Sequence, residues 1–112
     1  MYNFSYDKVS SVEQAAEVMR AAEDGKFLAG GQTMLPTMKH RLADPSNLID
    51  LGGINELKEI SSDNSSVTIG AMVTHATVAA SSEIKEAIPA LAKLAGNIGD
   101  PAVRNRGTIG GS

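Results

Sequence analysis

Two pairs of adjacent glycines are the residues of this sequence whose type and spacing could do chemistry. One pair lies in AGGQTMLP (residues 29–36) and the other in TIGGS (residues 108–112). Glycine has no Cβ, so its backbone can approach an anion closely, and the first N–H groups of a helix that follows such a loop lack partners. Gln32 and Thr33 add side-chain donors after the first pair. This chemistry suits a pyrophosphate, although a glycine pair after a strand is also consistent with a simple tight turn.

The glycine loops match no standard phosphate motif, because the sequence contains neither G-x-x-x-x-G-K-[ST] nor G-x-G-x-x-G. Asp50 is therefore predicted to be a strand-end or turn residue rather than a ribose ligand. His40 and His75 lack the spacing of a zinc site and are predicted at the surface or at helix ends. Arg104 and Arg106 either attract an anion or tie their loop to carboxylates. The sequence indicates binding rather than acid–base catalysis, and no catalytic or metal-binding residue is predicted.

The composition excludes several classes of protein. The chain has 112 residues, a formal net charge of −3 and no cysteine. The charge argues against nucleic-acid binding, and the lack of cysteine excludes disulfides and iron–sulfur ligation within these residues. No apolar run approaches the roughly 20 residues that span a bilayer, and the N-terminal residues do not resemble a secretory signal. We therefore expect a cytoplasmic location.

The first half of the chain predicts the elements that must position the first glycine pair. Residues 10–25 read as a helix, with a capping box made by Ser10 and Glu13 or by Ser11 and Gln14, and with Gly25 ending the helix. A strand is predicted at residues 26–30, a helix at 33–42 and another strand at 48–51. This order predicts a parallel pair of strands joined by a crossover helix.

The second half changes character. Residues 57–61 and 66–71 predict a hairpin, and residues 74–81 and 82–99 predict two or three short helices with caps at Thr74 and at Ser81 or Ser82. Pro89 is expected to split the second helical stretch. Residues 100–112 are predicted to be a loop. The fold class is therefore α+β, with a small parallel unit at residues 1–53 and a mixed unit at residues 54–112.

Three segments together resemble a known family: residues 27–51, residues 67–75 (VTIGAMVTH) and residues 98–112 (IGDPAVRNRGTIGGS). In order and spacing they resemble the FAD-binding domain of the molybdenum hydroxylases, of the carbon monoxide dehydrogenase and xanthine dehydrogenase type. The resemblance covers essentially the whole chain. It implies the vanillyl-alcohol-oxidase (PCMH) type of FAD-binding fold, with residues 1–53 as the first subdomain and residues 54–112 as the start of the second.

The resemblance also implies the cofactor and the residues that surround it. FAD would lie between the two subdomains, with both glycine loops around its pyrophosphate. The cofactor-binding residues implied in this way are Ala29, Gly30, Gly31, Gln32, Thr33, Met34, Gly70, Ala71, Thr74, Asp100, Thr108, Ile109, Gly110, Gly111 and Ser112. Gln32 stands where some members have a histidine.

The resemblance implies a role in electron transfer. Electrons would pass from a molybdenum centre through iron–sulfur clusters to FAD and then to NAD⁺, oxygen or a quinone. The partners would be a molybdenum-cofactor large subunit and an iron–sulfur small subunit, which agrees with the lack of cysteine here. Because the family's domain continues past TIGGS, we expect an N-terminal fragment that is inactive alone. The alternatives are a related flavoprotein, such as a vanillyl-alcohol-type oxidase or a cell-wall sugar-nucleotide reductase, and a remnant that binds no FAD.

Overall fold

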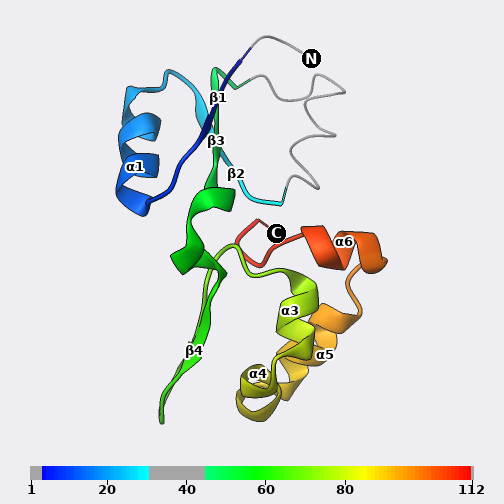
Figure 1. Cartoon of the computed structure of the whole chain (residues 1–112). Helices are drawn as coiled ribbons and strands as arrows, with labels where there is room; N and C mark the ends of the chain where they lie inside the picture. Colours follow the sequence, from blue (N-terminus) through cyan, green and yellow to red (C-terminus); the bar gives the residue numbers. More distant parts are fainter. Residues whose placement is uncertain (1–3, 31–44, 112) are drawn as a thin grey trace. The chain divides into compact units, whose positions relative to one another are not determined.

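The computed structural model describes residues 4–30 and 45–111. The chain divides into two compact units, Met1–Asn55 and Glu56–Ser112, which are shown with their elements in Figure 1. Each unit has its own sheet, a parallel one in the first and an antiparallel one in the second. This mixture of strands and helices confirms the predicted α+β class. Among the described residues, no helix has the length and apolar character needed to cross a bilayer.

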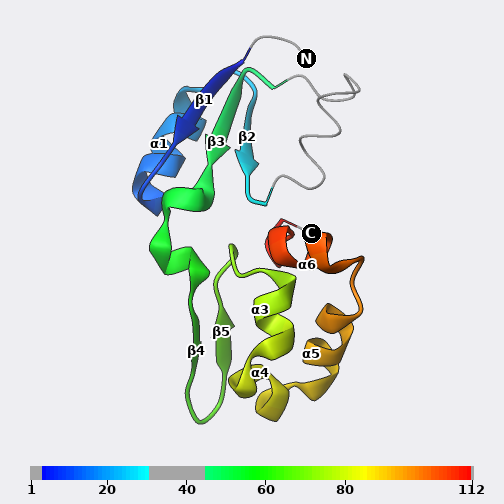
Figure 2. The same ribbon diagram turned by 45° about the vertical axis from the view of Figure 1, so that its right-hand side comes forward.

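The first unit is a three-stranded parallel sheet with one described helix. Its strands are β1 (Ser5–Lys8), β2 (Gly25–Leu28) and β3 (Asn47–Asp50). Their order is β1-β3-β2, so the last strand in sequence is the middle one (Figure 2). The predicted parallel pair is confirmed as β2 and β3. Strand β1 was not predicted, and all four of its residues are exposed.

Helix α1 (Val12–Ala21) begins at one of the two predicted capping boxes. The Ser11 hydroxyl accepts the N–H of Gln14 at 3.1 Å, and the Gln14 side chain accepts the N–H of Ser10 at 3.0 Å. The predicted end of the helix is wrong. The chain leaves the helix in an extended conformation at Ala22, with φ −78° and ψ 143°, and Gly25 is already the first residue of β2.

The core of the first unit depends on the central strand. Leu48 and Ile49 are neighbours in β3, so their side chains point to opposite faces of the sheet, and both are fully buried. We expect Ile49→Ala to lower the free energy of unfolding by about 3 kcal/mol, because it removes buried methyl groups and leaves a cavity. Urea denaturation followed by circular dichroism measures this loss. Val12→Ala is the matched control, since Val12 is 45% exposed, and an equal loss in both variants would contradict the prediction.

Asp50 lies at the end of β3, as predicted for a strand-end residue. Its Oδ1 accepts the N–H of Gly52 at 2.8 Å and so begins the short 3₁₀ helix η1 (Leu51–Gly53). Its Oδ2 accepts a hydrogen bond from the Tyr6 hydroxyl. This hydrogen bond to a carboxylate raises the pKa of Tyr6 above its usual value of 10.0.

The raised pKa predicts a change in stability at alkaline pH. A raised pKa in the folded state means that the neutral hydroxyl contributes stability below pH 10.0, and that this contribution is lost as the pH rises through the raised value. We expect the free energy of unfolding of Tyr6→Phe to fall less at alkaline pH than that of the wild type, because this contribution is absent from the variant. Urea denaturation of both proteins at about pH 8 and about pH 11 measures it. Parallel pH profiles for the two proteins would show that the Tyr6–Asp50 bond makes no contribution.

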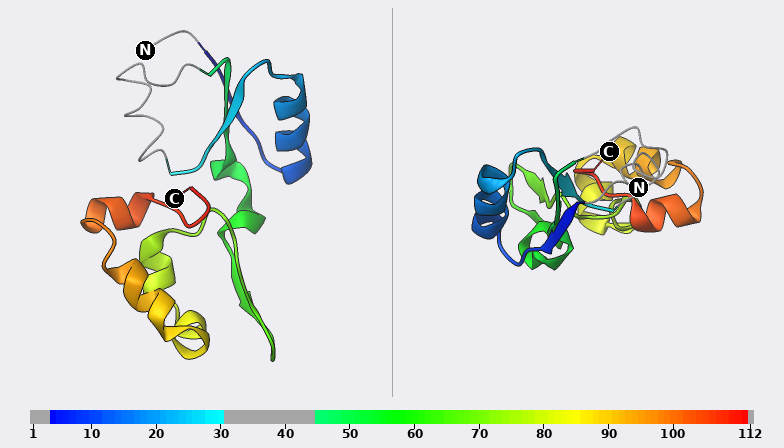
Figure 3. Two further views of the ribbon diagram at one scale, coloured as in Figure 1. Left: turned by 180° about the vertical axis from the view of Figure 1, so that it is seen from behind. Right: turned by 90° about the horizontal axis from the view of Figure 1, so that it is seen from above.

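The second unit is an antiparallel hairpin with four short helices. A 3₁₀ helix η2 (Asn55–Lys58) leads into β4 (Ile60–Ser62) and β5 (Val67–Ile69). The helices are α3 (His75–Ala80), α4 (Ser82–Ala87), α5 (Pro89–Gly96) and α6 (Pro101–Arg106). They lie on one side of the hairpin, as the view from behind in Figure 3 also shows. Their core is formed by Val73, Val78, Ile84, Ala92 and Ala95.

Most predictions for this unit are confirmed. The hairpin is present, Thr74 and Ser81 cap α3 and α4, and Pro89 separates α4 from α5. The predicted loop at residues 100–112 is wrong over its first part, because residues 101–106 form α6. Asp100 Oδ1 accepts the N–H of Val103 at 3.0 Å, and Pro101 occupies the first helical position, where its missing N–H has no cost.

Candidate functional site

The final described residues of the chain dock on the segment that follows β5. The N–H of Ile109 donates to the Val73 carbonyl at 2.9 Å, and the N–H of Gly110 donates to the Ala71 carbonyl at 2.9 Å. Thr74 and Thr108 form an antiparallel bridge. The fold therefore brings together two groups of predicted site residues, those at 70–74 and those at 108–111, although more than thirty residues separate them in sequence. We call residues 107–111 the glycine tail.

The N–H groups of the glycine tail are already used within the protein. In addition to Ile109 and Gly110, Gly111 donates its N–H to the Thr108 carbonyl at 3.2 Å and to the Thr108 hydroxyl at 3.1 Å. Thr108 is buried, whereas Gly110 and Gly111 are exposed. The tail thus offers an exposed turn without side chains, to which a large anion can come close, but it does not offer these three N–H groups as donors.

Two of the predicted site glycines are required by packing inside the protein. A Cβ on Gly110 would lie 2.6 Å from the Cβ of Ala71 and 2.8 Å from its carbonyl oxygen. A Cβ on Gly70 would overlap the carbonyl group of Leu57. The backbone at Gly70 is fixed there, because its N–H donates to the backbone carbonyl of Glu59 at 2.8 Å. Both positions therefore need glycine for close contact between backbones.

Thr74 and Asp100 have structural roles as helix caps. The Thr74 hydroxyl accepts the N–H of Thr77 at 3.2 Å and lies 2.9 Å from the Thr77 hydroxyl. The Asp100 carboxylate caps α6. Both side chains thus cap helices, and contact with a cofactor stays a prediction for both.

The first glycine loop is described only in part. Ala29 and Gly30 follow β2 and are half-buried. The predicted site residues Gly31, Gln32, Thr33, Met34 and Ser112, and the predicted helix at 33–42, lie outside the described residues.

Two residues near the glycine tail agree with the sequence-based expectation in place but differ from it in detail. One prediction was that Arg104 ties its loop to carboxylates. Arg104 does tie the loop, but to carbonyl groups: its Nη1 donates to the Gly99 carbonyl at 2.9 Å and to the Ile98 carbonyl at 3.3 Å. Gly99 has a φ of +53°, a conformation that favours glycine. His75 is at a helix end, as predicted, but its side chain is only 6% exposed. In the sequence, the one sign of this helix-end position is Thr74, the capping residue directly before His75.

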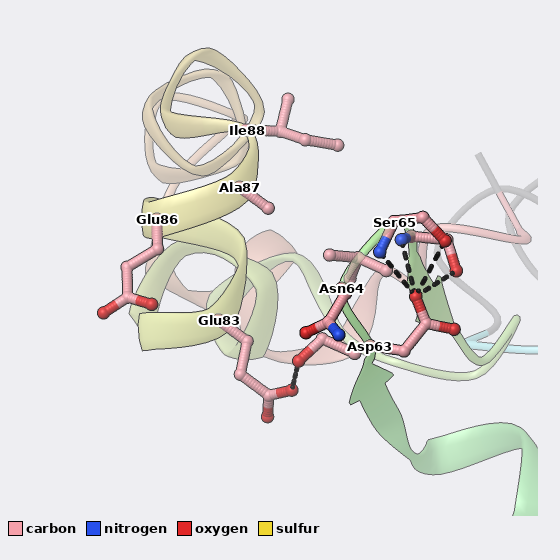
Figure 4. Close-up of a pocket in the computed structure, with 10 residues that line it drawn as sticks. Asp63, Asn64, Ser65, Glu83, Glu86, Ala87 and Ile88 are labelled. Atoms are coloured by element: carbon pink, nitrogen blue, oxygen red, sulfur yellow. Dashed lines mark hydrogen bonds between the residues drawn. The ribbon is translucent and has the colours of Figure 1, made fainter.

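A shallow pocket of about 470 Å³ lies between the hairpin turn and α4 (Figure 4). Its lining includes Asp63, Glu83 and Glu86. The N–H groups of Ser65 and Ser66 donate to Asp63 and hold the pKa of its carboxyl below the usual range. Three carboxylates would repel a phosphate, so this pocket does not suit an anionic cofactor. Within residues 4–30 and 45–111, no three acidic or histidine side chains are grouped to hold a metal ion.

Comparison with known proteins identifies the family. Residues 2–112 match the family described as the FAD binding domain in molybdopterin dehydrogenase. The chain belongs to this family, and its cofactor is FAD.

The relatives are subunits of larger oxidoreductases. The chain is 42% identical over 107 residues to the nicotine 6-hydroxylase medium subunit of Paenarthrobacter nicotinovorans, covering 96% of this chain and 38% of that one. It is 44% identical over 109 residues to the carbon monoxide dehydrogenase medium chain of Hydrogenophaga pseudoflava, with the same two coverages, 96% and 38%. Among solved structures, quinoline 2-oxidoreductase from Pseudomonas putida 86 gives a TM-score of 0.95 at 39% identity, covering 99% of this chain and 39% of that one. The chain thus spans well under half the length of these relatives.

Proposed function

We propose that this chain is the FAD-binding portion of the medium subunit of a molybdenum hydroxylase-type oxidoreductase. The observation that supports this most directly is the docking of the glycine tail on residues 71–74, because it brings together, within one unit, the predicted cofactor-binding residues at 70–74 and those at 108–111. Membership of the FAD-binding family supplies the identity of the ligand.

The exposed glycines of the tail support a pyrophosphate site there. Gly110 and Gly111 are exposed and carry no side chain, so a phosphate can lie against their backbone. Since the N–H groups of residues 109–111 donate within the chain, hydrogen bonds to the phosphates would come from elsewhere. We assign this part to the first loop, where Gly30 and Gly31 allow close approach and Gln32 and Thr33 carry donors.

Bound FAD would accept electrons from one redox centre and pass them to the next acceptor. In this proposal the electrons come from a molybdenum-cofactor large subunit through an iron–sulfur small subunit. These 112 residues contain no cysteine with which to hold a cluster, which agrees with clusters on a separate subunit. Its own contribution is to bind and orient the flavin.

Flavin retention by the full-length subunit tests the proposal. We expect the wild type to purify with a visible flavin absorption band, and Gly31→Val to lose it, because a side chain there would occupy the place of the pyrophosphate. Thr33→Ala should weaken FAD binding by only about 1–2 kcal/mol, the value of one hydrogen bond. A wild-type protein that neither retains FAD nor quenches its fluorescence on titration would favour the alternative of a remnant without a flavin.

A further inference from the structure

His75 carries a buried ring that the predicted cofactor site does not include. It is the first residue of α3, and its side chain lines a small apolar cavity of about 130 Å³ together with Leu91, Ala95 and Ile109. The cavity is walled by α5 on one side and by the glycine tail on the other, because Ile109 belongs to the tail. The ring therefore lies beneath the tail.

The tail contacts both the backbone and the imidazole ring of His75. The backbone N–H of His75 donates to the Gly107 carbonyl at 3.0 Å. A Cβ on Gly107 would lie 3.0 Å from the Val103 carbonyl oxygen, 3.1 Å from Cδ2 of the imidazole and 3.5 Å from Nε2. Gly107 thus lies against the ring, and an added methyl group would require the ring or the Val103 carbonyl to shift by a few tenths of an ångström. Two residues further on, Ile109 packs into the same cavity.

We propose that His75 is a positioning residue for FAD binding: its ring supports residues 107–109 and so fixes where Gly110 and Gly111 stand. This inference rests on the proposed function. A single antiparallel bridge with few hydrogen bonds holds the tail weakly, since each is worth only about 1 kcal/mol. The contact of Gly107 with the ring, and the packing of Ile109 in the same cavity against the core, supply the rest. His75 acts through the tail and is not proposed to touch the cofactor.

The experiment compares FAD affinity in the full-length subunit for the wild type, His75→Ala and Leu94→Ala, by quenching of flavin fluorescence. Leu94 is the matched control, because it lines the same cavity but is 64% exposed. Loss of the ring should lower the fraction of molecules with the tail in place to about a tenth, which raises the apparent Kd of His75→Ala about tenfold. Leu94→Ala should stay within about twofold of the wild type.

A second variant tests the same contact while keeping the ring. Gly107→Ala adds a methyl group against the imidazole and the Val103 carbonyl oxygen, so it should displace the tail and weaken FAD binding in the same direction. Gly96→Ala is its control, since a Cβ there would lie 3.7 Å from Ala79, an ordinary contact. If His75→Ala does not fold, the comparison of Gly107→Ala with Gly96→Ala tests the inference instead.

Amide hydrogen exchange of the FAD-free protein separates positioning from general stability. We expect faster exchange at Ile109 and Gly110 in His75→Ala, with the α5 amides unchanged. Exchange that is unchanged at the tail, or an affinity equal to that of Leu94→Ala, would overturn the inference while leaving the proposed function intact. A wild type without FAD affinity would instead refute the proposed function, and the inference that depends on it.

Discussion

Gly70→Ala is expected to lower the free energy of unfolding by about 3 kcal/mol, near the top of the usual range for overpacking. The new Cβ would overlap the carbonyl group of Leu57. That carbonyl cannot turn away freely, because it accepts the N–H of Met72 at 2.8 Å. One of two backbone segments must therefore move, which is more costly than moving the end of a flexible side chain.

Urea denaturation followed by circular dichroism gives the size of this effect. For a domain of this length the loss corresponds to a fall in Tm of about 10 °C or more. Gly96→Ala, at the end of α5, is the matched control, because it adds the same methyl group in open contact with Ala79. Equal stability of the two variants would show that the close approach of Gly70 to Leu57 is not required.

Gly110→Ala is expected to weaken FAD binding by about 30-fold, equivalent to about 2 kcal/mol. The added Cβ would lie 2.6 Å from the Ala71 Cβ and 2.8 Å from the Ala71 carbonyl oxygen. The tail would have to move away from residue 71 and would lose the hydrogen bond from the Gly110 N–H. The exposed glycine turn would then no longer be held in one place.

Fluorescence titration with FAD measures this loss, and a double variant shows its origin. Ala71→Gly removes the nearer of the two contacts, so Ala71→Gly/Gly110→Ala should recover part of the lost affinity. No recovery would mean that the alanine at 110 acts on the cofactor directly rather than on Ala71. An affinity of Gly110→Ala equal to that of Gly96→Ala would contradict the prediction altogether.

Elements with local signals were predictable from the sequence. Helix α1 has its capping box in adjacent residues, and Pro89 marks the start of α5 by its own chemistry. Helix α6 also had a signal in Asp100-Pro101, a cap followed by proline, but the glycines beyond it favoured a loop. Strand β1 had none, since Ser5–Lys8 is polar and exposed and becomes a strand only by pairing with β3.

The candidate site could be predicted only in its chemistry. The glycine pairs indicated a place where backbone meets an anion, and that required no knowledge of the fold. That Gly110 packs on Ala71, and Gly107 on His75, depends on contacts across more than thirty residues. Two of the three N–H donors of the tail, those of Ile109 and Gly110, are lost to carbonyl partners at the same long separation in sequence. No local pattern encodes such pairings.

The position of β3 in its sheet has a consequence for synthesis on the ribosome. Strands β1 and β2 emerge first, yet each pairs with β3 and not with the other. Until residues 47–50 leave the exit tunnel, neither strand has its sheet partner among the described residues, and α1 has no completed sheet to cover. Nascent chains that end before residue 47 should therefore be sensitive to proteases and prone to associate through these strands, and the sheet should close in one late step when β3 enters between them.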